Sequence, residues 1–140
     1  MKSKHNPTDM SDEELADHLV ASLPGGVFSS RSQWLDFLAA EEDGPIIMLN
    51  IATVGDADAY GRYVESATPA ATDVGIRIVA SGRPLLPMSP DAEPWDSFDL
   101  VEYPNRAAFV SMFLDERYQA AAPHRDAGLS AQLLWACIPD

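Results

Sequence analysis

The stretch of residues 95–129 limits the fold of this chain more than any other part of the sequence. Residues 95–103 alternate as a strand does, and Pro104 suits the first turn of a helix that follows it. A second helical region runs over residues 115–123 up to Pro123, and the apolar residues 129–138 predict a closing strand. Because the connections are only a few residues long, this pattern defines an architecture far better than it defines a reaction.

A similar order of elements precedes this stretch. Residues 46–51 form an apolar run that predicts a strand covered on both faces, and residues 56–73 carry an apolar stripe at helical spacing. Pro69 is expected to kink or end the last turn of that helix. Residues 75–82 are rich in β-branched side chains and predict a strand, after which the four prolines of residues 84–94 predict a loop or irregular edge.

Two further helices are expected before the first strand. Ser11 and Glu14 form a capping box that starts one helix, and Pro24-Gly25-Gly26 is expected to end it. Residues 30–42 carry apolar side chains at helical spacing and predict the second helix. We therefore divide the chain into an N-terminal helical extension, residues 1–43, and a main domain, residues 44–140.

The order of the main domain, β-α-β-β-α-β, predicts an α+β fold. It is typical of the ferredoxin-like sandwich, in which a four-stranded antiparallel sheet carries two helices on one face. The other face of the sheet would then present apolar side chains to water. A homodimer with the two sheets face to face would bury that surface, and coverage by the N-terminal helices is the alternative.

Composition disfavours several classes of protein. The 140 residues suit one domain, and a formal net charge of −13 disfavours nucleic-acid binding. No apolar run approaches the ~20 residues that a bilayer span needs, so we expect a cytoplasmic protein. The single cysteine, Cys137, excludes an intrachain disulfide, and the restriction of lysine to Lys2 and Lys4 argues against Schiff-base chemistry.

Short motifs spread over residues 45–138 carry a family resemblance. They are Met48-Leu49-Asn50, Ala80-Ser81-Gly82-Arg83, Trp95-Asp96, Val101-Glu102-Tyr103-Pro104, Arg106-Ala107-Ala108-Phe109, Tyr118-Gln119 and His124-Arg125. Together they resemble domain-of-unknown-function family thirteen-thirty. The resemblance implies the dimeric α/β-barrel superfamily, whose members include cofactor-free monooxygenases, lactone isomerases, polyketide cyclases and haem-handling enzymes. It also implies a ligand site between sheet and helices or inside the barrel.

His124 is the candidate for proton transfer. It is the only histidine beyond residue 20, and with Arg125 it is expected to follow a helix and Pro123, where it could exchange protons near neutral pH. The alternative is that the His-Arg pair caps exposed carbonyls at the helix end. One histidine cannot build a zinc or iron site from several imidazoles, so no metal is expected, and haem held by His124 alone is a minor alternative.

Two polar residues interrupt otherwise apolar strands. Asp99 shares a strand face with Val101 and Tyr103, at a position that is usually apolar in the family that the chain resembles. Facing an apolar cavity it would suit a general acid or base, whereas on an edge strand it would be a solvated charge. Asn50 is expected either to orient a ligand carbonyl or hydroxyl, or to cap a neighbouring turn.

Aromatic and basic residues complete the candidate site. Tyr60, Tyr63, Trp95 and Tyr103 are expected to line an aromatic pocket, with ordinary burial in the core as the alternative. Arg83 is expected to pair with an anionic ligand or, equally, with a surface carboxylate, and Arg125 is expected to contact the ligand beside His124.

These residues support a lead hypothesis and two alternatives. The lead is a small-molecule enzyme without a tightly held cofactor, in which His124 with Asp99 or Asn50 moves a proton on a carbonyl-containing organic substrate. The alternatives are a non-catalytic module that holds a small apolar ligand in the same cavity, and a structural homodimer whose N-terminal helices engage another protein. Nothing in the sequence fixes the substrate.

Overall fold

The computed structural model describes residues 9–23 and 28–140, and the elements follow the predicted order. The helices and strands are α1 (Asp12–Ser22), α2 (Arg31–Ala39), β1 (Ile46–Val54), α3 (Ala57–Asp73), β2 (Arg77–Gly82), β3 (Ser97–Tyr103), α4 (Arg106–Leu114), α5 (Glu116–Gly128) and β4 (Leu129–Cys137). The glycine-containing signal at residues 24–26 that was expected to end the first helix lies outside the described residues.

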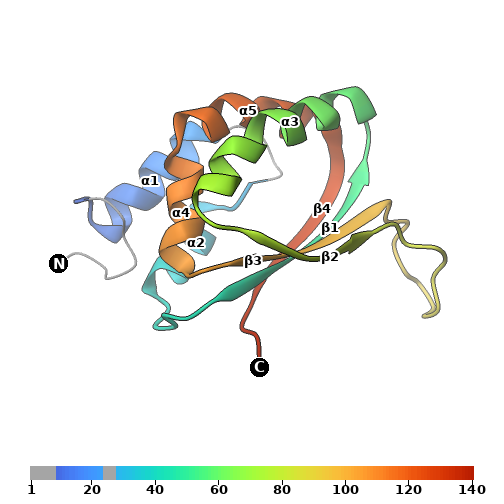
Figure 1. The fold of residues 1–140 in the computed structure, drawn as a ribbon, viewed down its shortest axis with the longest axis horizontal. Helices are drawn as coiled ribbons and strands as arrows, with labels where there is room; N and C mark the ends of the chain where they lie inside the picture. The colour runs from blue at the N-terminus through green and yellow to red at the C-terminus, as the bar shows by residue number, and fades with distance from the viewer. Residues whose placement is uncertain (1–8, 24–27) are drawn as a thin grey trace.

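The strands form one four-stranded sheet in the order β2-β3-β1-β4. Each neighbouring pair is antiparallel, and Asn50 of β1 lies opposite Asp99 of β3 and opposite Leu134 of β4. Helices α3, α4 and α5 lie together on one face of this sheet (Figure 1). Strand order and helix placement confirm the predicted ferredoxin-like sandwich.

Local capping explains where the first helices begin. The hydroxyl of Ser11 accepts from the backbone N–H of Glu14, and the Glu14 side chain accepts from the Ser11 N–H, which confirms the predicted capping box. Ser30 and Gln33 form the same arrangement at the start of α2. Each box satisfies N–H groups that the first helical turn leaves without partners.

Prolines have less effect on the helices than expected. Pro69 lies inside α3 and Pro123 lies inside α5, and both helices continue beyond them. The expectation that His124 and Arg125 follow a helix end is therefore wrong, since both lie within α5. Packing of α5 against α3 outweighs the hydrogen bond that each proline removes.

The helix that was expected to start at Pro104 begins slightly later, at Arg106. Asn105 is its N-cap, because its side-chain oxygen accepts from the Ala108 N–H at 2.8 Å. The predicted helical region that follows is a separate helix, α5, for which Asp115 is the N-cap. The single second helix of the predicted sandwich is thus divided into α4 and α5.

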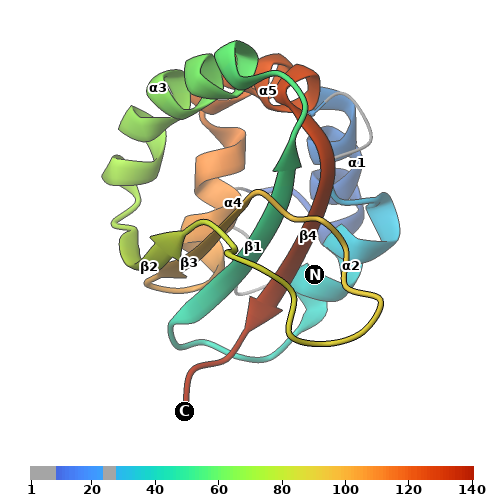
Figure 2. The same ribbon diagram turned by 90° about the vertical axis from the view of Figure 1, so that its right-hand side faces the viewer.

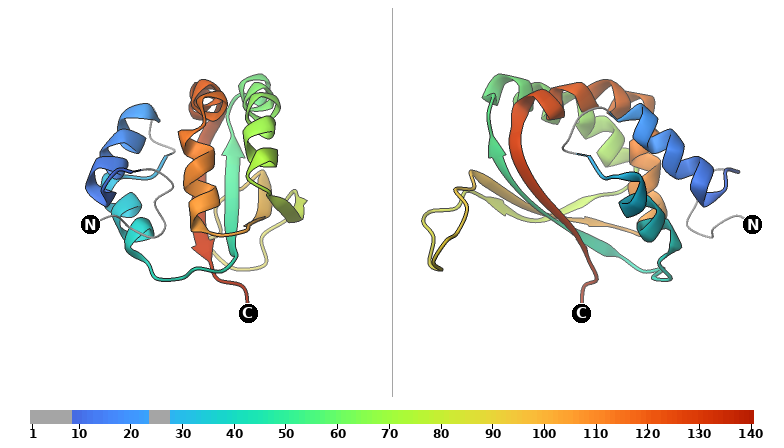
Figure 3. Two further views of the ribbon diagram at one scale, coloured as in Figure 1. Left: turned by 60° about the vertical axis from the view of Figure 1, so that its left-hand side comes forward. Right: turned by 180° about the vertical axis from the view of Figure 1, so that it is seen from behind.

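The N-terminal helices share the hydrophobic core of the main domain. Leu15 and Leu19 of α1 and Trp34 of α2 belong to the same buried cluster as Phe109 and Phe113 of α4. Trp34 lies between them, with its ring centroid 5.3 Å from that of Phe113. As Figures 2 and 3 show, α1 and α2 lie beside α4 rather than across the sheet. In the described part of the chain the extension therefore does not cover the second sheet face.

That second face is mainly apolar. The side chains that alternate onto it from β1, β3 and β4 include Ile47, Leu49, Ile51, Phe98, Leu100, Leu133 and Trp135. Glu102 of β3 lies on the same face and forms an ion pair with Arg77 of β2. Trp135 is 62% exposed. The loop between β2 and β3 projects past the strand ends (Figure 1) and exposes Leu85 and Met88 almost completely. Among the helices that the structure describes, none is both long and apolar enough to cross a membrane.

Candidate functional site

A small cavity of about 50 Å³ lies between the sheet and the helices. Its lining comes from β1, β3 and β4 on one side and from α3, α4 and α5 on the other, and consists of Met48, Asn50, Tyr63, Val101, Tyr103, Phe109, Met112, Phe113, Tyr118, Arg125 and Leu134. Most of these side chains are apolar or aromatic. The exceptions are the Asn50 amide, the tyrosine hydroxyls and the Arg125 guanidinium, so the cavity has a few polar groups on an apolar background, as small-molecule sites do.

Arg125 is the charged group of this cavity. Its side chain is buried, and its guanidinium carbon lies 5.0 Å from the ring centroid of Phe28 and 5.6 Å from that of Tyr63. Within residues 9–23 and 28–140, it makes no hydrogen bond or ion pair, and these two rings are its cation–π contacts. Burial acts to lower the pKa of Arg125, while the surrounding tyrosines raise it, and the net direction is upward.

Tyrosines surround the guanidinium. The hydroxyls of Tyr63 and Tyr118 share a hydrogen bond of 3.0 Å, and the Tyr103 hydroxyl donates to Met112 Sδ at 3.8 Å. Burial raises the pKa of Tyr103 and of Tyr118, so both hydroxyls are neutral at physiological pH. They are therefore hydrogen-bonding groups and not counter-charges for Arg125.

Asn50 is oriented by a neighbour on β4. Its Oδ1 accepts from Nε2 of Gln132 at 2.9 Å. Nδ2 of Asn50 remains as a donor beside the cavity, with no hydrogen bond to any described residue. Oε1 of Gln132 is likewise buried without a partner. The sheet side of the cavity thus has a fixed amide donor, Asn50 Nδ2, that a ligand can use.

Asp99 extends this polar region along β3. It lies opposite Asn50 in the β1–β3 pairing, and its half-buried carboxyl makes no hydrogen bond or ion pair within the described part of the chain. Burial raises the pKa of Asp99. Tyr60 of α3 lies close enough to Asp99 and Arg125 to be affected by both charges. Burial and the Asp99 carboxylate raise the pKa of Tyr60, and the Arg125 guanidinium lowers it. Asp99 does not line the cavity itself, but it borders the Asn50 end of it.

Close contact between α3 and α5 brings the helix residues together. A Cβ atom at Gly128 would lie 2.7 Å from the backbone nitrogen of Tyr60, so only glycine fits there. The Gly128 carbonyl also accepts from the N–H groups of Gly55 and Asp56, at the start of α3. These contacts place Tyr60 and Tyr63 over the same part of the sheet as Arg125.

Of the residues proposed from the sequence, the structure brings six together. Asn50, Tyr63, Tyr103 and Arg125 line the cavity, and Asp99 and Tyr60 lie beside it. His124 is half-buried on α5 but does not line the cavity, and it has no hydrogen bond or ion pair in the described ranges. We therefore assign the acid–base role in the candidate site to Asp99 and not to His124.

The two other proposed residues lie away from the cavity. Trp95 lines a pocket formed by the loop between β2 and β3, and Arg83 is exposed at the start of that loop. Gln132 and Tyr118 are cavity neighbours that the sequence analysis did not propose. Tyr118 lies about two helical turns before Arg125, so helical spacing contained a signal for it. Gln132 depends on strand register, for which the sequence has no comparable signal.

A larger groove of about 360 Å³ lies between α2 and the edge strand β4. It is lined mainly by apolar side chains such as Phe37, Leu134 and Trp135, with Asp36 as its charged residue. Because no buried charge faces this groove, we place the candidate site in the smaller cavity. Across residues 9–23 and 28–140, the His, Cys, Asp and Glu side chains form no group of three that could hold a metal ion.

Comparison with known proteins connects this fold to a family. The family model described as domain of unknown function (DUF1330) matches residues 46–136. The crystal structure of RPA0582, a protein of unknown function from Rhodopseudomonas palustris, is 30% identical, with a TM-score of 0.76 over 83% of this chain and 98% of that chain. The methylated RPA0582 protein is also 30% identical, with a TM-score of 0.74 over 82% of this chain and 95% of that chain.

A more distant structure shares the fold alone. It is a dabb family protein with a ferredoxin-like fold from Mesorhizobium loti, which is 17% identical, with a TM-score of 0.52 over 69% of this chain and 97% of that chain. Among curated proteins none matches the chain. Because the DUF1330 model covers most of the chain, including β1 to β4 and the cavity between them, the protein belongs to this family of unknown function.

Proposed function

We propose that this protein is a cofactor-free enzyme that moves a proton on a carbonyl-containing small molecule bound between the sheet and the helices. The observation that carries the proposal is the Asp99 carboxyl, which is half-buried, has a raised pKa because of burial, and has no partner among the described residues. A carboxylate with a raised pKa is a better base at neutral pH than an exposed one.

The proposed step is abstraction of a proton from a carbon next to a carbonyl group. The C–H bond breaks, the proton moves to an Asp99 carboxylate oxygen, and the electron pair moves onto the carbonyl oxygen as an enolate. Asn50 Nδ2 is the donor for that oxygen, because Gln132 already occupies Asn50 Oδ1. Return of the proton to the same or another carbon completes an exchange or an isomerisation, with no oxidant or cofactor consumed.

We propose further that the protein acts as a homodimer through the uncovered sheet face. Leu49 of β1 lies opposite Leu100 of β3 and Trp135 of β4, which makes an apolar stripe across three strands. A single chain would expose this stripe to water, and a second copy stacked on the same face would bury it. Trp135→Glu should convert the dimer to monomers in size-exclusion chromatography with light scattering.

Hydrogen–deuterium exchange tests the proposed chemistry directly. In D₂O, a panel of small carbonyl compounds is incubated with the protein, and loss of the signal of the hydrogen next to the carbonyl is followed by proton NMR. We expect Asp99→Asn to lower the exchange rate by about a hundredfold or more, since a positioned base contributes roughly that factor. Asp58→Asn removes an exposed carboxylate on α3 and is the matched control.

Two outcomes would contradict the proposal. Exchange that is equal in the wild type and in Asp99→Asn would remove Asp99 as the base. Saturable binding of the same compounds without any exchange would favour a non-catalytic binding module, in which the cavity holds a ligand without changing it.

A further inference from the structure

The buried guanidinium of Arg125 has no counter-charge and no hydrogen-bond acceptor among the described residues. Arg125 is 4% exposed, and its contacts are the faces of Phe28 and Tyr63 rather than oxygen atoms. Burying a guanidinium is costly unless it is paired and hydrogen-bonded, so buried arginines normally face a carboxylate or several carbonyls. The guanidinium instead lines a cavity.

We propose that the ligand of this cavity is a small organic carboxylate, and that Arg125 binds its carboxylate group. The inference rests on the proposed use of this cavity for a small molecule, and it adds the chemical class of that molecule. A planar guanidinium can donate two parallel N–H bonds to one carboxylate, which supplies the missing counter-charge. The hydroxyls of Tyr63 and Tyr118 lie beside it, and since one of them already donates to the other, one O–H remains to donate to the same group.

The cavity favours a short monoanion over phosphate. Its volume of about 50 Å³ accommodates only a few heavy atoms, and the residues near Arg125 include apolar side chains such as Met112, Phe113 and Leu134. These suit an organic carbon chain and not a strongly hydrated dianion. The formal net charge of −13 also opposes binding of a multiply charged anion.

Two polar groups that line the cavity then fit two polar groups of one molecule. Arg125 contacts the cavity from α5, and Asn50 contacts it from β1, next to Asp99. A short oxo acid can place its carboxylate on Arg125 and its carbonyl oxygen on Asn50 Nδ2. The carbon between or beside these groups would then face Asp99, so the anion site positions the substrate for the proposed proton transfer.

Paired ligands that differ only in charge test the proposal. Propionate and its uncharged analogue propionamide are titrated into the wild-type protein and into Arg125→Met by isothermal calorimetry, with pyruvate as the oxo acid. We expect propionate and pyruvate to bind the wild type, propionamide to bind weakly or not at all, and Arg125→Met to weaken carboxylate binding about a hundredfold. Arg62→Gln, which removes an exposed arginine of α3, should bind as the wild type does.

The variant itself needs a check on folding. Thermal unfolding of Arg125→Met followed by circular dichroism shows whether the fold is intact, and Arg125→Lys keeps the charge without the planar fork. The expected pattern is partial retention of carboxylate binding in Arg125→Lys, together with the full, about hundredfold loss of affinity in a folded Arg125→Met. Equal binding of propionate to the wild type and Arg125→Met, or equal binding of propionate and propionamide, would overturn the proposal.

The proposed chemistry and the proposed ligand class can fail separately. Carboxylate binding that depends on Arg125, without deuterium exchange, would support the anion site and contradict the proposed enzymatic activity. Exchange on neutral ketones that depends on Asp99, with no carboxylate binding, would support the proposed enzymatic activity and contradict the anion site.

Discussion

Two arginines of this protein are buried, and their surroundings differ. Arg106 is 2% exposed and Arg125 is 4% exposed. Arg106 donates from Nε to the carbonyl oxygen of Glu42 at 2.6 Å and from Nη1 to that of Phe37 at 2.7 Å. Arg125 has aromatic rings where Arg106 has oxygen atoms.

The difference separates a structural charge from a functional one. Burial lowers the pKa of Arg106, and the nearby carboxylates of Asp43 and Glu42 oppose that shift. The carbonyls that it binds lie at the end of α2 and just after it, so Arg106 fastens the N-terminal helices to α4. Arg125 connects nothing in this way. Its charge is buried without an oxygen partner among the described residues, an arrangement that natural proteins keep mainly at functional sites.

Removing Arg106 should have the largest effect on stability. We expect Arg106→Met to lower the free energy of unfolding by about 3–5 kcal/mol, because it breaks two part-buried, charge-assisted hydrogen bonds to backbone carbonyls. Chemical denaturation measures the change, with Arg62→Met as an exposed control. A loss no greater than that of the control would show that Arg106 does not hold the extension in place.

Separating α5 from α3 should come next. We expect Gly128→Ala to lower the free energy of unfolding by about 2 kcal/mol, since the new Cβ meets rigid backbone atoms of Tyr60 at 2.7 and 2.8 Å. Gly61→Ala is the matched control, because nothing lies within 4 Å of a Cβ placed there and alanine favours a helix. If both variants behave alike in thermal unfolding, close packing at Gly128 does not position the tyrosines around Arg125.

Removing Arg125 should cost much less stability than removing Arg106. We expect Arg125→Met to lower the free energy of unfolding of the ligand-free protein by no more than about 1 kcal/mol, because it breaks no hydrogen bond and loses only two cation–π contacts. Chemical denaturation in buffer without carboxylate is the measurement. A loss of stability comparable to that of Arg106→Met would mean that Arg125 is structural.

The sequence predicted those parts of the fold that depend on neighbouring residues. Ser11 and Glu14 lie three positions apart, and their capping box follows from that spacing. The order of strands and helices then limited the topology to the sandwich that the structure confirms. Pro123 was misinterpreted, because its local preference to end a helix is outweighed by the packing of α5 on α3.

The candidate site was predicted only in part. Asn50 and Asp99 were recognisable as polar residues in apolar strands, and they prove to be partners across the β1–β3 pairing. The bond between Asn50 and Gln132 joins residues 82 positions apart, and its register is set by long-range pairing. His124 and Arg125 are both expected at the ligand from the sequence, but which of two adjacent helix residues points inward depends on helix packing, and Arg125 alone lines the cavity.

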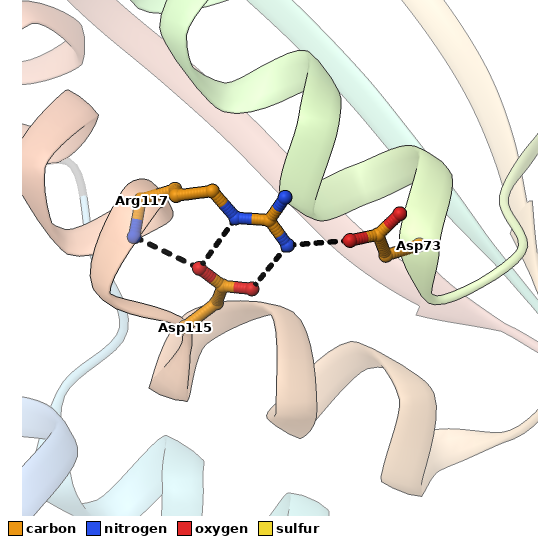
Figure 4. Close-up of polar contacts among 3 residues, drawn as sticks. All are labelled: Asp73, Asp115 and Arg117. Carbon is orange, nitrogen blue, oxygen red and sulfur yellow. Dashed lines mark hydrogen bonds and ion pairs between the residues drawn. The ribbon is translucent and has the colours of Figure 1, made fainter.

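Arg117, unlike Arg106 and Arg125, is exposed, so solvent screens its charge. Arg117 on α5 is held by Asp115, through Nε at 3.0 Å and Nη2 at 2.7 Å, and by Asp73 of α3 at 2.6 Å (Figure 4). The side-chain hydrogen bond from Arg117 lowers the pKa of Asp115, whereas burial raises the pKa of Asp99. A paired carboxylate and an unpaired one should therefore respond to acid in opposite ways.

The smallest predicted effects, each below about 1 kcal/mol at neutral pH, distinguish these two carboxylates. Asp115→Asn keeps the N-cap but loses the charge, so it should destabilise the protein, and the difference from the wild type should vanish as pH falls from 3.8 through the lowered folded-state pKa. Asp99→Asn should stabilise it, because ionised Asp99 is disfavoured in the folded state. That gain should disappear as pH falls through the raised folded-state pKa of Asp99 towards 3.8. Thermal unfolding of both variants across this acid range is the measurement, and a stabilising effect of Asp99→Asn that persists in acid would show that its cause is packing and not the burial of a charge.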